Sequence, residues 1–215
     1  MVFSLIGDSK PRNRRLFFDV VARLTQVVTI VCFFCGAVSA ADSQVLVSER
    51  TNVRVTELAS GLEHPWALAF LPNGAMLITE RPGRLRYFYQ GELSPQFIKG
   101  LPPIHAEGQG GLLDVVIDPK FSVNRLIYFS YVRGTSGGMA TSVARARLEG
   151  MTLSGLDVIF NSNPMTEQSR HFGSRLLFGV DGALLVTLGD HGQRSWAQDR
   201  TVYPGSVIRI WPTGG

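Results

Sequence analysis

His171 is the residue of this chain whose type and position could support acid–base chemistry. It lies in the polar stretch Ser169–Gly173, upstream of the apolar segment Leu184–Leu188, and a second polar loop, Gly189–Asp199, follows that segment. Polar loops beside hydrophobic strands commonly carry the functional residues of a rigid scaffold. Because an imidazole exchanges its proton near neutral pH, His171 could be a catalytic base. A loop histidine hydrogen-bonded to the backbone is the alternative, and the residue types alone leave both open.

The other histidines and the cysteines do not predict a metal site. His105 and His191 share no zinc-type spacing with each other or with a cysteine. Cys32 and Cys35 form a C-x-x-C, a spacing that can bind metal or do redox chemistry, but they lie within an apolar N-terminal run, so we assign them no function. From residue 41 onward the chain has no cysteine, and it must be held together by its hydrophobic core.

The N-terminal segment is typical of a secretory signal peptide. Basic residues up to Arg23 are followed by an apolar run, Val27–Val38, and by small residues ending at Ala40. The apolar run is about a dozen residues long, shorter than the roughly 20 that a spanning helix needs. We therefore predict a signal peptide over residues 1–40, a mature protein over 41–215 that does not span a membrane, and a periplasmic or secreted location. An uncleaved membrane anchor is the alternative.

The charge of the chain does not predict a nucleic-acid partner. Its 21 basic and 17 acidic residues give a net charge of +4. Five of the basic and two of the acidic residues lie in the first 40 positions, which leaves 16 and 15 for the remainder. A nearly neutral body gives no electrostatic reason to expect nucleic acid or an anionic membrane surface as a partner.

After residue 41 the sequence predicts strands and no amphipathic helix. Apolar and polar residues alternate in short segments, as in half-buried strands, and turn signals such as Asn73-Gly74 separate them. Met151–Phe160 is predicted to be a loop leading to a short edge strand. The other predicted strands lie within Val45–Leu58, Ala67–Leu71, Met76–Thr79, Arg84–Tyr89, Leu112–Ile117, Leu126–Val132, Thr141–Leu148, Leu176–Phe178, Leu184–Leu188 and Val207–Trp211.

An internal repeat indicates the architecture. Leu68–Thr79 matches Leu176–Thr187 position by position at a shift of 108 residues, and Leu113–Phe129 is a looser third copy. Repeated β units favour a propeller, whose blades are meanders of about 40–50 residues, over a sandwich. At that period the mature chain would hold roughly three to four blades.

Five motifs follow one another along the chain. They are Gly61–Gly74 (G-L-E-H-P-W-A-L-A-F-L-P-N-G), Gly108–Val116 (G-Q-G-G-L-L-D-V-V), His171–Leu176 (H-F-G-S-R-L), Gly189-Asp190 and Ala197-Gln198-Asp199. Together and in this order they resemble the soluble PQQ-dependent glucose/sorbosone dehydrogenase family, and within it the aldose sugar dehydrogenases of bacterial periplasms. The resemblance extends from about Glu49 to Trp211.

The resemblance implies an all-β fold of the six-bladed β-propeller type, incomplete in this chain. It implies pyrroloquinoline quinone (PQQ) and calcium as cofactors, an aldose substrate oxidised at C1 by hydride transfer to the quinone, and an external electron acceptor. His171 matches the histidine that takes the hydroxyl proton. The calcium ligands are expected beyond residue 215, so no metal ligand is predicted in this chain.

Three further residues are implied as contacts of the cofactor or the sugar. Gln109 lies among glycines, which would let the backbone approach a ligand closely. Gln198 matches a second polar contact, in a loop of variable spacing. Arg175 would either neutralise a cofactor carboxylate or pair structurally with Asp190. Asp190 and Asp199 could contact calcium, although loop aspartates more often cap turns.

One departure from the family pattern leaves other functions open. The family's Gly-Lys-Val-x-Arg-Ile stretch is Gly205–Ile210 here, with Ser206 in place of the lysine. A propeller binding module without catalysis, or an inactive fragment, is therefore the alternative function. A calcium-dependent lactonase is a third candidate, but the strand ends offer no obvious set of carboxylates for it.

Overall fold

The computed structural model describes residues 43–47, 49–50 and 52–214. The predicted signal peptide lies outside these residues. The chain separates into two compact units, one ending at Glu57 and the other beginning at Leu58. In the first unit, β1 (Ser43–Val47) pairs with β2 (Asn52–Thr56) as an antiparallel hairpin. Within the described part of the chain, no helix has the length and apolar character needed to cross a membrane.

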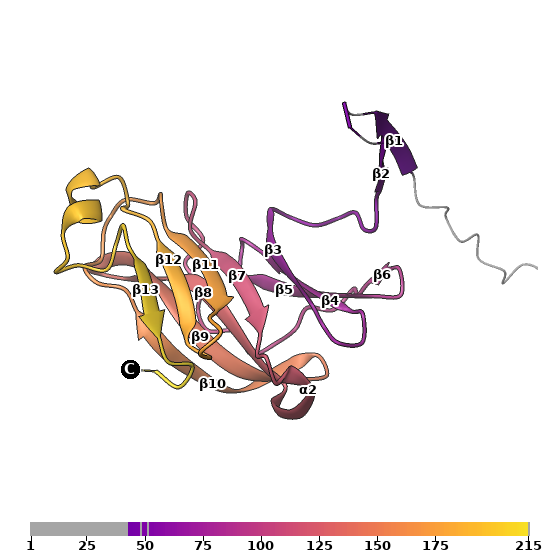
Figure 1. Cartoon of the computed structure of the whole chain (residues 1–215). Coiled ribbons are helices and arrows are strands. Elements are labelled where there is room, and N and C mark those ends of the chain that lie inside the picture. Colours follow the sequence, from indigo (N-terminus) through magenta and orange to yellow (C-terminus); the bar gives the residue numbers. More distant parts are fainter. Residues whose placement is uncertain (1–42, 48, 51, 215) are drawn as a thin grey trace, which may run out of the picture. The chain divides into compact units, whose positions relative to one another are not determined.

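The second unit consists of three antiparallel meander sheets, seen side by side in Figure 1. The first is β3 (Pro65–Phe70), β4 (Met76–Glu80), β5 (Arg84–Tyr89) and β6 (Glu92–Leu93); the second is β7 (Leu112–Ile117), β8 (Leu126–Thr135), β9 (Gly138–Glu149) and β10 (Thr152–Asn161); the third is β11 (Gly173–Phe178), β12 (Leu184–Leu188) and β13 (Val207–Ile210). Two single helical turns, α2 (Phe121–Asn124) and the 3-10 helix η1 (Arg194–Gln198), interrupt the strands.

The sheets pack through their first strands. β7 contacts β3 and β4 on one side and β11 on the other, so each sheet begins next to its neighbour. One apolar cluster, including Leu77, Leu112 and Phe129, fills the space between the first and second sheets. A second, including Val143, Leu176 and Val186, lies between the second and third. This is the packing of neighbouring propeller blades, because each sheet meets the next one face to face across an apolar layer.

The repeat found in the sequence is a repeat of structure. The β3–β4 and β11–β12 hairpins turn in the same way, with φ of +82° at both Gly74 and Gly182. The side chains of Asn73 and Asp181 each accept the N–H of the residue two positions on, at 3.2 and 3.1 Å. Glycine fits here because its lack of a Cβ makes a positive φ inexpensive.

Each sheet also has the same irregularity between its first two strands. The register of the first strand shifts, which leaves one backbone N–H to pair with a hydroxyl on the second strand. The N–H groups and the hydroxyls that accept them are Ala67 with Thr79 (3.0 Å), Asp114 with Ser130 (2.9 Å) and Arg175 with Thr187 (2.9 Å).

These hydroxyls also join one sheet to the next. The Thr79 hydroxyl donates to the Leu113 carbonyl at 2.6 Å, and the Ser130 hydroxyl donates to the Ser174 carbonyl at 2.8 Å. Both acceptors immediately precede the bulge residue of the following sheet. The inter-sheet contact is therefore the same chemical contact, made twice.

The prediction for Met151–Phe160 was wrong. This segment belongs to β10, a full ten-residue edge strand and not a loop. Register shifts between Ser154 and Asp157 and between Val158 and Phe160 break its alternation of apolar and polar residues. Gly155, with φ of +61°, lies within the first shift. A bulged strand loses the period of two by which strands are recognised in a sequence.

Candidate functional site

A pocket of about 470 Å³ opens at the edge where the three first strands begin. His171 and Phe172 precede β11, Gln109 precedes β7, and Arg81 follows β4. The ends of second strands and the starts of first strands share one edge because the sheets are antiparallel. The lining residues are Trp66, Arg81, Gly108, Gln109, His171, Phe172 and Gly173. The pocket thus brings together residues from all three sheets.

His171 is held by a carboxylate at the end of the neighbouring strand. Its Nδ1 lies 2.8 Å from Asp190 Oδ1. That oxygen also accepts the backbone N–H of Gly192 at 2.8 Å. The Gly192 N–H, and after it the His171 ring, hold the pKa of Asp190 below its usual value. An ionised carboxylate accepts hydrogen bonds only. In the neutral imidazole, Nδ1 therefore carries the proton and the lone pair lies on Nε2.

Gln109 fixes the backbone of the histidine loop. Its side-chain Oε1 accepts the N–H of His171 at 2.8 Å. Its own N–H donates to the Ser169 carbonyl, also at 2.8 Å. These two bonds join the loop before β7 to the loop before β11. The amide oxygen is oriented toward the His171 backbone, so Gln109 can offer a ligand its two amide N–H groups.

Arg81 is a pocket residue that the sequence analysis missed. Its guanidinium donates to the carbonyls of Gly108 and Gly110, on either side of Gln109. It follows the second strand of the repeated hairpin, so its counterpart at a shift of 108 is Gly189. The repeat could have identified it, because both positions lie at the pocket edge directly after β4 or β12.

Arg175 is paired with Asp114, and the predicted structural pairing with Asp190 was wrong. Arg175 Nη1 lies 3.2 Å from Asp114 Oδ1, and its guanidinium stands 4.5 Å from the centre of the Trp66 ring. Burial raises the pKa of Asp114, although the Leu176 N–H and Arg175 act in the opposite direction. Arg175 keeps an exposed side chain beside the pocket, and the predicted role as a cofactor contact stays a prediction.

The structure does not bring Gln198 into the pocket. Gln198 is exposed in η1, and among the described residues it is not one of those that line the cavity. Trp196, in the same 3-10 helix, packs edge-on against His191, with ring centres 6.2 Å apart. The tryptophan that lines the pocket is Trp66.

Two glycines let the histidine and its carboxylate approach each other. A Cβ at Gly173 would come within 2.7 Å of the Gly189 nitrogen, and one at Gly189 would collide with the His171 carbonyl. Contacts this short with backbone atoms cannot be relieved by rotating a side chain. The close passage of the two segments therefore requires glycine at both positions.

No metal-binding cluster is present in the part of the chain that the structure describes. Within residues 43–47, 49–50 and 52–214, no group of three or more His, Cys, Asp or Glu side chains could hold an ion. Asp199 accepts the N–H and the hydroxyl of Thr201, at 2.8 and 2.6 Å, and Asp190 accepts the Gly192 N–H. Both aspartates therefore cap turns, as loop aspartates commonly do.

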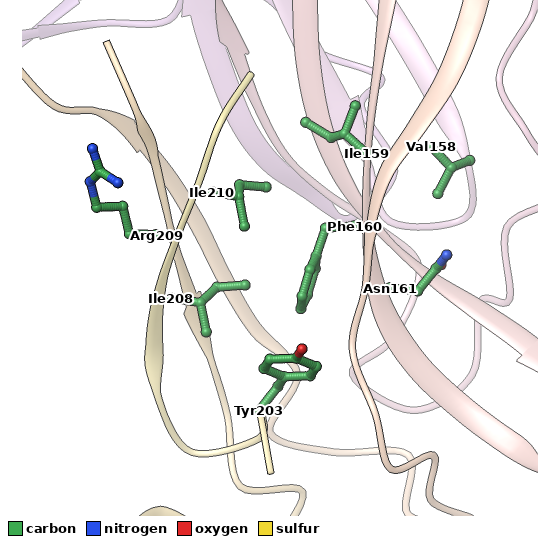
Figure 2. Close-up of a pocket in the computed structure, with 8 residues that line it drawn as sticks. All are labelled: Val158, Ile159, Phe160, Asn161, Tyr203, Ile208, Arg209 and Ile210. Carbon is green, nitrogen blue, oxygen red and sulfur yellow. The ribbon is translucent and has the colours of Figure 1, made fainter. Parts of the chain in front are cut away.

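A second cavity, of about 570 Å³, lies between β10 and β13. Figure 2 shows Ile208 and Ile210 pointing toward Phe160, with Tyr203 below. Among the described residues that line it, Arg209 alone is charged, and it is paired with Asp181 at 2.8 Å. A mainly apolar lining whose charged group is already paired offers little chemistry, so the candidate site is the pocket at His171.

Comparison with known proteins gives matches over most of the second unit. The family model "Glucose / Sorbosone dehydrogenase" matches residues 62–215. The aldose sugar dehydrogenase YliI of Escherichia coli strain K12 is 39% identical over 176 residues, which cover 80% of this chain and 47% of that protein. The chain spans about half the length of the curated relatives it matches.

Solved structures give the same result. A glucose dehydrogenase superposes with a TM-score of 0.70 at 43% identity, over 74% of this chain and 50% of the other. The PQQ-bound aldose sugar dehydrogenase of Streptomyces coelicolor superposes with a TM-score of 0.65 at 27% identity, over 81% and 50%. These neighbours confirm the all-β fold of the six-bladed propeller type, of which the described part of the second unit forms three sheets.

Proposed function

The chain belongs to the glucose/sorbosone dehydrogenase family, and on that premise we propose that the pocket at His171 is the sugar-oxidising site of a PQQ-dependent aldose dehydrogenase. The observation that supports this most directly is the contact between His171 and Asp190. It gives a histidine at the edge of a pocket one ring nitrogen that can accept a proton. A hydroxyl group that is oxidised must lose such a proton.

The pocket residues fit a planar, anionic, aromatic cofactor. PQQ is a fused aromatic quinone that carries carboxylates. Arg81 and Trp66 line the pocket, and the Arg175 guanidinium packs over the Trp66 ring. Two guanidinium groups and a flat aromatic surface therefore lie at or beside the pocket. Guanidinium groups pair well with carboxylates. Gln109 adds amide N–H donors. When bound, PQQ supplies the carbonyl carbon that accepts the hydride from the sugar.

The chain's own residues would then bind and deprotonate the sugar. His171 Nε2 takes the proton of the C1 hydroxyl, and the charge that develops on the ring is stabilised by Asp190 at 2.8 Å. Gln109 holds the His171 backbone, and Arg81 holds the two carbonyls that flank Gln109. The base is thus positioned by contacts from two other sheets, which limits its movement during proton transfer.

Further parts of the proposal follow from the family. We propose calcium as a second cofactor, an external electron acceptor, and a periplasmic or secreted location. These rest on the resemblance of the motifs and on the N-terminal sequence. A propeller that binds ligand without turnover is the second candidate, since the chain spans about half the length of its relatives.

Quinone binding and sugar oxidation, measured separately, test the proposal. The purified chain is mixed with PQQ and Ca²⁺; binding is followed by quinone absorbance, and turnover by reduction of a dye with aldoses. We expect binding, dye reduction, and slower reduction with an aldose carrying deuterium at C1. His171→Ala should keep quinone binding and lose turnover. Binding without turnover in the unaltered chain would favour the binding module, and absence of both would refute the site.

A further inference from the structure

His191 is a buried histidine to which the proposed mechanism gives no role. It follows Asp190 directly in the chain and is 1% exposed. Its ring packs edge-on against two aromatic rings, with centres 4.9 Å from Phe172 and 6.2 Å from Trp196. Phe172 lines the pocket, whereas His191 is not among the described residues that do so. The His191 ring therefore packs behind a residue of the pocket wall.

The His191 ring is bonded to the backbone just before the proposed base. Its Nδ1 lies 3.1 Å from the carbonyl oxygen of Arg170. A carbonyl oxygen can only accept a hydrogen bond, so Nδ1 donates. Burial lowers the pKa of His191, which favours the neutral ring with a single N–H. That N–H is therefore the one that the Arg170 carbonyl accepts.

The peptide group between Arg170 and His171 is held at both of its ends. Its carbonyl accepts the His191 ring N–H, and its N–H donates to Gln109 Oε1 at 2.8 Å. A peptide group is planar, so contacts at both ends fix the orientation of the whole plane. The backbone N–H of His191 also donates to the His171 carbonyl, at 3.4 Å. His191 therefore contacts the backbone on both sides of the His171 Cα atom.

His171 has a backbone conformation that depends on such contacts. Its φ is +53°, in the left-handed region that residues with a side chain adopt infrequently. Such conformations persist where the surrounding structure imposes them. The value of φ also sets the direction of the Cα–Cβ bond relative to the preceding peptide group. If that group were released, the ring would no longer be held with Nδ1 at 2.8 Å from Asp190 Oδ1.

We propose that His191 is a positioning residue for His171: its ring N–H holds the Arg170 carbonyl, and this keeps the His171 ring against Asp190. For catalysis this role rests on the proposed function, and for the placement of the His171 ring it rests on the contacts alone. Gln109, before the second sheet, supplies one half of the support, and His191 supplies the other half. Loss of the His191 ring N–H should therefore let the base move without removing it.

Two substitutions separate the hydrogen bond from the bulk of the ring. His191→Phe keeps an aromatic ring against Phe172 and Trp196 but has no N–H. His191→Asn lacks the ring and places an amide N–H near the position of Nδ1. We expect His191→Phe to lower kcat by about 10-fold while KM stays within about twofold, because a displaced base affects the transition state more than sugar binding. His191→Asn should keep a kcat at least about threefold above that of His191→Phe.

His64→Phe is the matched control. It makes the same replacement at another histidine of positive φ, +47° against +52° at His191, so it carries the same cost of placing phenylalanine in the left-handed region. The side chain of His64 is exposed, and kcat should stay near that of the unaltered chain. All variants are assayed well below their melting temperatures, so that unfolding does not contribute. A His191→Phe variant with the kcat of His64→Phe would overturn the positioning role.

Nitrogen chemical shifts of the His171 ring test its placement without turnover. They show which ring nitrogen carries the proton of the neutral imidazole, and this is set by the hydrogen bond that the ring makes. The chain has four histidines, and the signal of His171 is the one missing from His171→Ala. We expect the proton on Nδ1 in the unaltered chain and in His191→Asn, and a shift toward Nε2 in His191→Phe.

The two readouts distinguish failure of the positioning role from failure of the proposed function. The same proton distribution in the unaltered chain, His191→Asn and His191→Phe would overturn the positioning role, even in a chain that oxidises sugars. The expected change of proton distribution in a chain without turnover would refute the proposed function and support the placement of His171 by His191.

Discussion

The first and third sheets share one hairpin and differ in what they place at its edge. Both turn through a glycine at φ +82°, and both pair a threonine hydroxyl with a bulge N–H. Both are also preceded by a histidine with positive φ, +47° at His64 and +53° at His171. After the second strand, however, the first sheet continues with Arg81 and the third continues with a glycine and Asp190.

The difference shows that the repeat builds the scaffold, and in the function we propose the residues beside it carry the chemistry. The His64 carbonyl accepts the Arg81 N–H at 3.0 Å, so His64 contributes a backbone hydrogen bond to the first sheet. The His171 ring contacts a carboxylate. The two histidines both have a positive φ and precede a first strand, although they are offset by one position in the repeat. Their side chains differ in what they contact because of the residue that follows the neighbouring strand.

Removing the imidazole at His171 should have the largest effect. His171→Ala should lower kcat by about 10²- to 10⁴-fold, the usual contribution of a general base. Dye reduction at saturating aldose measures the loss, and quinone absorbance shows whether the cofactor still binds. A variant with kcat near that of the unaltered chain would mean that the proton leaves by another route.

Changing the carboxylate should have a smaller effect with a distinct signature. Asp190→Asn keeps the size of the side chain but replaces the ionised acceptor, so His171 is no longer held with its proton on Nδ1. We expect kcat to fall on the order of 10-fold or more, and the pH profile of kcat to change, because the group facing His171 has lost its charge. An unchanged pH profile would argue that Asp190 only caps the turn, through its hydrogen bond with the Gly192 N–H.

The shared threonines should differ in their effect on stability. Thr79→Val leaves the Ala67 N–H and the Leu113 carbonyl without their buried partner, a cost of about 1–3 kcal/mol in the free energy of unfolding. Thr187→Val removes one bond, to the exposed Arg175, and should cost about 0.5–1 kcal/mol. Chemical denaturation of both variants measures the difference.

The pH dependence of stability should arise at the third sheet. His191, whose counterpart in the first sheet is Gly83, is buried, and burial lowers its pKa from the usual 6.5. The folded protein keeps the ring neutral while the unfolded chain takes up a proton near pH 6.5. This stability is therefore complete above that pH and is lost as the pH falls toward the folded pKa.

Thermal unfolding measures this effect. We expect the melting temperature to fall by on the order of 2 °C more between pH 7.5 and 5.5 in the unaltered chain than in His191→Gln. An equal fall in melting temperature for the two proteins would show that His191 is not the source of the pH dependence.

The smallest effect is expected at His64. His64→Ala removes an exposed side chain and leaves the backbone bond to Arg81 in place. Stability should change by less than about 0.5 kcal/mol, and kcat should stay within about twofold of that of the unaltered chain. It is the matched control for His171→Ala, since both replace a histidine of positive φ before a first strand. A large loss at His64 would mean that the first sheet also takes part in the chemistry.

The sequence predicted the fold better than it predicted the site contacts. The hairpins could be recognised because Asn73-Gly74 and Asp181-Gly182 are local turn signals that recur at a fixed shift. The bulged β10 could not, since its irregular register removes the alternation. Arg175 and its partner Asp114 are 61 residues apart, and Arg81 is 27 residues from Gly108. Such contacts are set by how sheets pack, which no local pattern in the chain encodes.

The two glycines beside His171, Gly173 and Gly189, limit which positions of this site can be substituted. Positions 173 and 189 accept no side chain without displacing the backbone that carries His171. A directed-evolution library aimed at a new sugar would therefore lose most of its members if it varied these two positions. The exposed residues Gln193–Ser195, in the same loop as Asp190, tolerate variation far better. Substitutions there would leave the contact between His171 and Asp190 in place.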